Sequence, residues 1–285
     1  MIDFYHIINP YIASRGSESE AVQRQTFSSL HLAKDFAKDV VNVRHVLRVD
    51  KQDEAEFHKV PPIPGCVVEP LERCSSDIAS FQISRRLPLL ADLFNSSFLS
   101  TEAEKERPFG EDHKAYVIYT NMDICLAPFF YTECARLIAA NHECFVVNRR
   151  TVAKEYLNRP LLEGFLASSK PHPGHDCFVF PLASLREFAL TDSIVGIGFV
   201  FRPLLLNCIL TFGGRFREFN ELFLTAHYGD DMEWKDPRYS DYLEHNKRQL
   251  IGLWDQFRNR IENADAATKK LLEKFFRFGF LQRVI

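Results

Sequence analysis

The chain has 285 residues, of which 46% are hydrophobic, and a formal net charge of −3. This length provides a full hydrophobic core for one large domain or two small ones. The 35 basic and 38 acidic residues nearly balance, which argues against polyanion binding through net charge. We expect no nucleic-acid partner, although a local basic patch stays open. The first residues lack the basic start and apolar run of a secretory signal, and the seven cysteines form no C-x-x-C pair. We therefore expect free thiols in a reducing compartment and a cytoplasmic location.

The first part of the chain predicts strand, loop, helix and strand. Residues 2–8 are β-rich and end at an Asn-Pro turn signal. Ser17 and Glu20 have the spacing of a capping box, and an apolar helical period follows them. Residues 40–49 alternate as a second strand, and the Pro- and Gly-bearing segment 60–70 predicts a loop around a short strand.

The rest of the chain predicts further helices alternating with strands. A helix is expected over 79–98, with Pro88 as a point of restart, and another whose first turn holds Pro128. From about Arg238 the chain is helical and charged. The apolar segment 193–213 predicts a buried helix broken near Pro203, because charged and polar residues in its middle oppose insertion into a bilayer. Strands are expected at 115–119, 144–150, 177–181 and 223–231. This alternation predicts an α/β fold with a mixed, mostly parallel sheet flanked by helices.

A carboxylate, Asp123, directly follows the apolar strand that ends at Thr120. In an open α/β sheet, ligands collect beyond the carboxyl ends of the strands. A charge at that position needs a partner, and a divalent cation such as Mg²⁺ or Mn²⁺ would provide one. The alternative is that Asp123 caps the helix that begins near Pro128.

Two further polar clusters lie beside predicted strands. His172, His175 and Asp176 surround a Pro-Gly pair just before the strand at 177–181, which predicts a loop at a functional site. His227, Asp230 and Asp231 follow another strand. Each cluster alone could be an ordinary turn whose polar groups have hydrogen-bond partners. Together with the Asp123 segment, however, three such clusters in one sheet favour a common site.

Four segments together carry a family resemblance: YTNMDICLAPFFY (119–131), FVVNRR (145–150), HPGHDCFVFP (172–181) and TAHYGDDMEW (225–234). With the N-terminal strand and loop, their order resembles the GT-A class of nucleotide-sugar glycosyltransferases over residues 2–236. The resemblance implies a nucleotide-sugar-binding domain over 1–236 and a helical C-terminal extension, 237–285, packed on it. In that class the acidic triplet is usually Asp-x-Asp. Here Asn121 holds the first position, which leaves Asp123 as the one carboxylate of the triplet.

Carried over by position, the resemblance assigns roles to site residues. Asp123 and His227 would hold Mn²⁺ or Mg²⁺, which offsets the charge developing on the departing nucleoside diphosphate. Asp176 would take the proton of the acceptor hydroxyl if the enzyme inverts. Further candidates for contacts with the donor or acceptor are Asn9, Tyr11, Arg15, Arg85, Arg86, Asn121, Asn148, Arg149, His172 and His175. For the arginines a solvated surface role is the alternative, for Asn148 and Arg149 helix capping, and for the two histidines a structural role.

The sequence thus favours a metal-dependent glycosyltransferase that moves a sugar from a nucleoside diphosphate donor to a glycan or other hydroxyl acceptor. One alternative is a zinc metallohydrolase that uses His172, His175 and Asp176 of the HPGHD segment together with His227. Another is a glycosyltransferase-like domain that binds without turnover, suggested by Asn121. The basic amphipathic segment 268–285 could contact a membrane surface or a partner, but we expect its apolar face to pack on its own domain.

Overall fold

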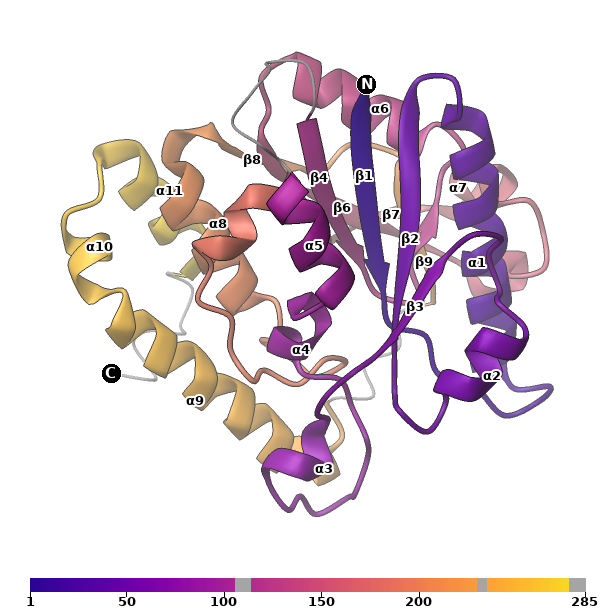
Figure 1. The fold of residues 1–285 in the computed structure, drawn as a ribbon, viewed down its shortest axis with the longest axis horizontal. Helices are drawn as coiled ribbons and strands as arrows, with labels where there is room; N and C mark the ends of the chain where they lie inside the picture. The colour runs from indigo at the N-terminus through magenta and orange to yellow at the C-terminus, as the bar shows by residue number, and fades with distance from the viewer. Residues whose placement is uncertain (106–113, 230–234, 277–285) are drawn as a thin grey trace. The chain divides into compact units, whose positions relative to one another are not determined.

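The computed structural model describes residues 1–105, 114–229 and 235–276 and contains two compact units (Figure 1). The first unit comprises residues 1–72, 96–183 and 218–231. The second comprises 73–95, 184–217 and 232–285. Each unit therefore draws on three stretches of chain, and neither coincides with the consecutive segments 1–236 and 237–285, whose separate roles stay a prediction.

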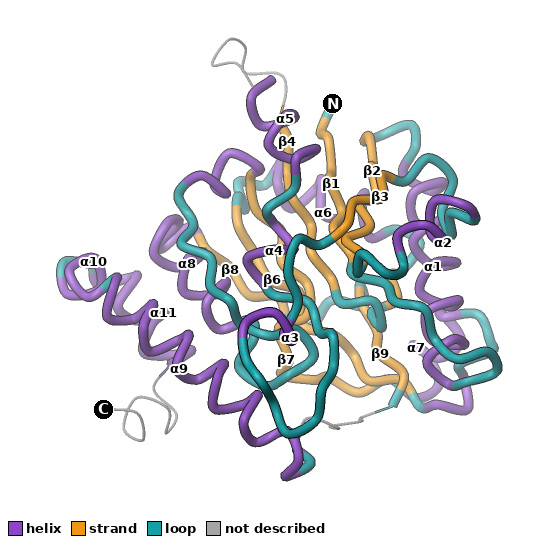
Figure 2. Tube along the Cα trace, turned by 60° about the horizontal axis from the view of Figure 1, so that its bottom comes forward, coloured by secondary structure: helices purple, strands orange, loops and turns teal. Residues whose placement is uncertain are grey.

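The first unit is built on one mixed sheet, whose strands lie side by side in Figure 2. Its order is β3-β2-β1-β4-β7-β6-β9-β5, and β8 pairs with β6 off this path. Pairing is parallel from β3 to β4 and between β6 and β9, whereas β7 runs antiparallel to both of its neighbours. The strands are β1 (Ile2–Ile8), β2 (Val41–Val49), β3 (Val67–Pro70), β4 (Lys114–Thr120), β5 (Cys125–Leu126), β6 (Cys144–Val152), β7 (Lys170–Pro181), β8 (Phe216–Phe219) and β9 (Thr225–Tyr228). The predicted α/β sheet flanked by helices is confirmed.

Helices cover both faces of this sheet. Successive strand residues point to opposite faces of a sheet, so the contacts of Phe4 and Tyr5 of β1 show what covers each face. Phe4 lies in the core cluster with residues of α1 (Glu18–Ala37) and α6 (Phe130–Ala139). Tyr5 packs edge-on against Phe98 of α5 (Ser97–Lys105), with ring centroids 5.7 Å apart. The remaining helices of this unit are α2 (Glu54–Lys59) and α7 (Leu161–Ser168).

The start of α1 has one of the two hydrogen bonds of the predicted capping box. Ser17 is the N-cap residue, and its side chain accepts a hydrogen bond from the Glu20 backbone N–H at 3.1 Å. The Glu20 carboxylate accepts one from the Gly16 backbone N–H. The Ser17 bond satisfies a backbone donor that the first turn of a helix leaves without a partner, whereas Gly16 lies before the N-cap residue, whose own N–H the full box would engage.

A polar network lies inside the core of the first unit. His6 contacts the Tyr131 hydroxyl through Nδ1 at 2.7 Å and the Thr120 hydroxyl through Nε2 at 2.9 Å. His45 reaches the same Tyr131 hydroxyl through Nε2 at 3.0 Å. Burial is the main cause that lowers the pKa of His6 well below its usual value and that of His45 to about 3. Both imidazoles are therefore neutral in the folded protein at neutral pH.

The second unit is mainly helical. Its helices are α3 (Ser75–Ile78), α4 (Leu90–Phe94), α8 (Arg202–Phe212), α9 (Ser240–Gln256), α10 (Arg258–Glu262) and α11 (Ala266–Phe276). Pro203 lies in the first turn of α8, so the predicted break there is the start of the helix. Within the described ranges, no helix combines the length and apolarity needed to cross a membrane. In α11, Leu272, Phe275 and Phe276 are buried, so its apolar face packs within the protein as expected; residues 277–285 lie outside the described part.

The helix expected over 79–98 is wrong in its first half, because only α4 and the start of α5 are helical there. Residues 79–89 are held in a non-helical path by side chains that lie outside this segment. The Tyr242 hydroxyl donates to the Ile83 carbonyl and accepts from the Arg85 N–H, and the Ser75 hydroxyl accepts from the Leu87 N–H. These tertiary bonds replace the helical ladder.

Two smaller predictions also need correction. The segment 170–176 is not a loop but the first part of strand β7. Pro128 lies just before α6, whose N-cap residue is Phe129, and not in its first turn.

Candidate functional site

The reversed direction of β7 explains why the predicted residues meet at one edge of the sheet. Strand β7 is antiparallel to β4 and β6, so β4 and β6 run in the same direction, as do β1 and β9. The carboxyl ends of these four strands therefore share an edge with the amino end of β7. Asn9 follows β1, Asn121 and Asp123 follow β4, His227 lies in β9, and residues 170–176 begin β7. Asn9, Asn121 and Asp123 thus lie beyond strand ends, as expected, whereas His227 and residues 170–176 lie within strands β9 and β7.

Asp123 and His227 form an ion pair at this edge, with His227 Nε2 3.2 Å from Asp123 Oδ2. The Asp123 side chain is 44% exposed, yet its Oδ1 is buried and has no hydrogen-bond partner among the described residues. Burial opposes ionisation of both groups, but their mutual hydrogen bond and charge outweigh it. The pKa of Asp123 is consequently lowered and that of His227 raised. His227 Nδ1 lies 2.8 Å from the Gly229 carbonyl, which orients the ring.

Arg149 and Asp176 form a second ion pair, with Arg149 Nη1 3.3 Å from Asp176 Oδ2. Their side chains are only 12% and 11% exposed, and the contact lacks hydrogen-bond geometry, so Oδ2 has no hydrogen-bond partner in the described part of the chain. The Arg149 charge also acts on the first pair. It helps to lower the pKa of Asp123 and partly offsets the rise in the pKa of His227. The two ion pairs therefore belong to one electrostatic cluster.

An irregularity of the sheet places Asp176. In the β6–β7 ladder Val147 pairs with Cys177, but the next residue, Asn148, pairs with His175, so Asp176 has no residue opposite it. A second shift lies between Asn148 and Arg150. Such bulges re-aim side chains and recur beside functional sites.

Tyr119 is a site residue that the sequence did not reveal. It lies in the apolar run of β4, one residue before the strand ends at Thr120. Its hydroxyl donates to Asn121 Oδ1 at 2.9 Å and lies 3.5 Å from Asn9 Oδ1. Burial, followed by the charges of Asp123 and Asp176, raises the pKa of Tyr119 well above its usual value. Tyr119 therefore stays protonated and links the residues that follow β1 and β4.

The two histidines of the HPGHD segment have different partners. His172 accepts the Gly174 N–H at Nδ1 (2.9 Å), and its Nε2 lies 3.4 Å from Arg149. His175 Nε2 lies 2.9 Å from Oε1 of Glu218, which also accepts from the Asn148 side-chain amide at 3.2 Å. Sequence reasoning missed Glu218. Its segment, RFREF (215–219), resembles an exposed strand. The zinc alternative needs both histidines on one ion, whereas this arrangement directs them to Arg149 and Glu218.

The remaining candidates have other surroundings. Tyr11 and Arg15 lie on an exposed loop, where the Tyr11 backbone N–H donates to the Gln23 side chain. Arg85 and Arg86 belong to the second unit and to its non-helical segment, not to the helix that was expected. The Arg85 guanidinium lies over the Tyr239 ring, 5.1 Å from the centroid. Asp230 and Asp231 lie outside the described residues.

Asp123 and His227 could hold a metal only together with a ligand. In the described part of the chain, no group of three or more His, Cys, Asp or Glu side chains could hold a metal ion. Asp123 and His227 offer two donors 3.2 Å apart, a carboxylate and an imidazole, a combination that suits Mn²⁺ better than Mg²⁺. The buried Oδ1 of Asp123 is the atom that lacks a partner. A ligand with oxygen donors, such as a diphosphate, would have to complete the coordination.

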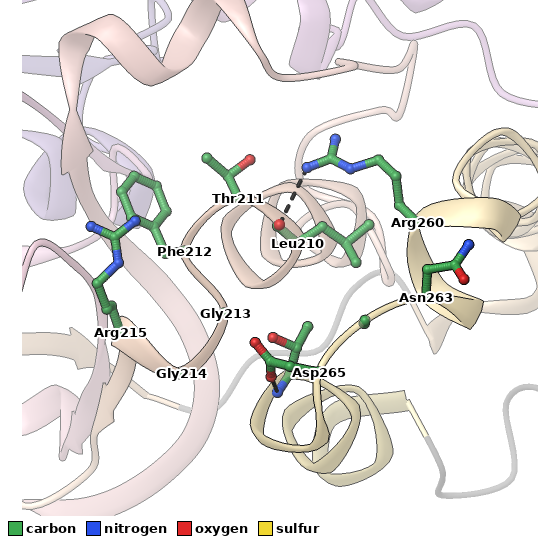
Figure 3. A pocket seen from close by; sticks show the side chains of 11 residues that line it. Leu210, Thr211, Phe212, Gly213, Gly214, Arg215, Arg260, Asn263 and Asp265 are labelled. Atoms are coloured by element: carbon green, nitrogen blue, oxygen red, sulfur yellow. Dashed lines mark hydrogen bonds between the residues drawn. The ribbon is translucent and has the colours of Figure 1, made fainter.

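The second unit has a pocket of its own, of about 560 Å³, between the end of α8 and the α10–α11 connection (Figure 3). Its polar groups already serve the fold. Arg260 donates to the Leu210 carbonyl at 3.2 Å, and Asp265 accepts from the Thr268 N–H at 2.7 Å, which caps α11. Nothing in this lining resembles the paired charges of the first unit.

The sequence matches no protein-family model and no curated protein. Among solved structures it is similar to S. aureus TarS, with 13% identity and a TM-score of 0.46 over 99% of this chain; the chain spans 43% of TarS. It is similar to the mannosyltransferase PcManGT from Pyrobaculum calidifontis, solved with GDP-Man and Mn²⁺, with 10% identity and a TM-score of 0.42 over 99% of this chain and 82% of that one. Mouse xyloside xylosyltransferase 1 follows, with 10% identity and a TM-score of 0.32 over 88% and 82% of the two chains. Two of these three proteins carry the names of glycosyl-transferring enzymes.

Proposed function

We propose that this protein is a metal-dependent glycosyltransferase that moves a sugar from a nucleoside diphosphate donor to a hydroxyl acceptor. The observation that carries the proposal is the buried, unpartnered Oδ1 of Asp123 beside His227. A buried carboxylate oxygen without a partner is costly, and a cation supplied with the donor would remove that cost.

On the donor side, Asp123 and His227 would hold Mn²⁺, which supplies charge stabilisation to a departing diphosphate. Arg149 is well suited to the same group, since a guanidinium pairs with phosphate oxygens in a bidentate manner. Tyr119 keeps Asn9 and Asn121 in place beside it through its hydroxyl. Ribose or base contacts from Tyr11 and Arg15 belong to the proposal as well.

On the acceptor side, Asp176 would accept the proton of the attacking hydroxyl in an inverting reaction. Arg149 neutralises this carboxylate when no donor is bound. A diphosphate that draws the Arg149 guanidinium toward itself would leave Asp176 available to the acceptor. His172, which lies beside Arg149, would help to orient either substrate.

The test is titration calorimetry with GDP, UDP, ADP and CDP, with and without Mn²⁺. We expect one nucleotide to bind more tightly with Mn²⁺, and Asp123→Ala to lose that gain, by at least about tenfold in affinity. Asp35→Ala is the matched control, because Asp35 also pairs with a histidine, His31, at 3.5 Å in the same unit. Its nucleotide binding should equal that of the wild type.

Two outcomes would change the assignment. If no nucleoside diphosphate binds to the wild type in either condition, the proposal is refuted. If a nucleotide binds but no sugar is transferred or hydrolysed from any matching donor, the protein is a binding domain without turnover.

A further inference from the structure

Glu218 joins three strands beside the proposed site. This carboxylate lies in β8, is 8% exposed, and accepts hydrogen bonds at Oε1 from His175 of β7 and from Asn148 of β6. Asn148 is 3% exposed, and its own Oδ1 has no partner in the described part of the chain. One buried oxygen thus holds two strands that are neighbours in the sheet.

The two side chains that Glu218 holds are the chain neighbours of the second ion pair. Asn148 directly precedes Arg149, and His175 directly precedes Asp176. These are also the positions where the β6–β7 register shifts. In a regular ladder, backbone hydrogen bonds fix how residues align, but at a bulge the local ladder is disrupted. Side-chain bonds therefore have to supply the alignment there.

Asp176 is confined from its other side by Gly174. A Cβ at position 174 would lie 2.7 Å from Asp176 Oδ2 and 2.8 Å from His172 Nδ1, closer than real Cβ contacts. The room around the carboxylate is therefore limited. A small shift of His175 would carry Asp176 with it, because the two residues share a peptide bond.

We propose that Glu218 is a positioning residue for Asp176 and Arg149, acting through His175 and Asn148; this rests on the proposed function. Glu218 does not touch the substrates. Its loss would move the proton acceptor relative to the attacking hydroxyl while Asp123 and His227, on β9 and after β4, stay in place. Turnover should therefore suffer far more than nucleotide binding.

The experiment compares Glu218→Ala with Glu218→Gln by kcat, KM and calorimetric Kd for the nucleoside diphosphate with Mn²⁺. We expect Ala to lower kcat by about 100-fold, because misplacement by about 1 Å costs that much. The Kd should change by less than about tenfold, since the proposed metal ligands Asp123 and His227 are not moved and Arg149 is only one of the proposed diphosphate contacts. Gln should keep most of the turnover, because its amide oxygen can accept the same two hydrogen bonds. If the Ala variant does not fold, Glu218→Asp gives the same readout, because the shorter side chain cannot reach both partners.

Glu69→Ala is the matched control for a merely structural role. Glu69 is a carboxylate of the same unit whose side chain is 13% exposed. It lies in β3 and pairs with Arg48 of β2 at 2.8 Å, away from the site in the sheet order. This variant should lose thermal stability but keep the kcat of the wild type. The inference is overturned if Glu218→Ala keeps its kcat, or if Glu218→Gln is as impaired as Glu218→Ala. A wild type that binds no nucleoside diphosphate refutes the proposed function, and this role with it.

Discussion

Replacing Arg149 by Met should destabilise the first unit, because it leaves the Asp176 carboxylate without its cation. Removing one member of a buried ion pair costs about 3–5 kcal/mol. The two side chains are 12% and 11% exposed, and the 3.3 Å contact lacks hydrogen-bond geometry, which places the expected loss at the lower end. We therefore expect Arg149→Met to lower the free energy of unfolding by about 3 kcal/mol.

The loss should be relieved by a second substitution. In Arg149→Met/Asp176→Asn the buried charge is gone, so at least half of the lost stability, about 1.5 kcal/mol, should return. Urea unfolding followed by circular dichroism measures all four proteins of the cycle. Arg136→Met is the matched control, because Arg136 pairs with Glu133 on the exposed surface of α6 and its removal should leave the transition in place.

The reasoning fails if the double variant is no more stable than Arg149→Met. Asp176 would then not be the group that Arg149 neutralises, and the ion pair would not be the organising contact of the site. It also fails if Arg149→Met is as stable as the wild type.

Three further predictions concern the same unit. His6 and His45 are neutral in the fold with pKa values below 6.5, so the unfolded chain binds more protons as the pH falls below 6.5. Stability should drop by about 1.4 kcal/mol per histidine from pH 7.5 to 5.5. Urea midpoints at the two pH values measure this, and His45→Gln should show a smaller drop. Gly174→Ala should lower turnover, because the added Cβ would lie 2.7 Å from the Asp176 carboxylate. A kcat of the Ala variant equal to that of the wild type would contradict this. Cys66 is the half-buried thiol while the other six are buried, so a thiol reagent should modify it first, and Cys66→Ser should abolish the fast phase.

Much of the sheet could be predicted because its strands are apolar runs bounded by turn residues. Parallel strands covered on both faces need apolar side chains throughout, and the run before Asn121 shows this directly. The general rule that ligands gather beyond strand ends then located Asp123 and His227, which the structure brings within 3.2 Å of each other.

The rest depends on contacts between residues far apart in the chain. The local signal against a helix in the segment 79–89 is Pro88, which predicts only a restart. The non-helical path before Pro88 depends on Tyr242, more than 150 residues later, through Ile83 and Arg85. The register shifts that place Asp176 depend in the same way on how β6 meets β7. Tyr119 was hidden because an aromatic residue in an apolar run is ordinary core, and only its hydroxyl partners distinguish it.

The order of strands in the sheet also affects how the protein is made. Strand β5 pairs with β9, and Asp123, just before β5, finds its partner His227 in β9. About 100 residues separate these strands, so a ribosome adding about 5–20 residues per second needs about 5–20 s between them. During that interval the nascent chain carries an unpaired strand and an unpaired carboxylate. Slowing translation between residues 126 and 225 should therefore lengthen the chain's exposure to chaperones. A chain stopped at Arg217 should lack His227, one half of the proposed metal-binding pair.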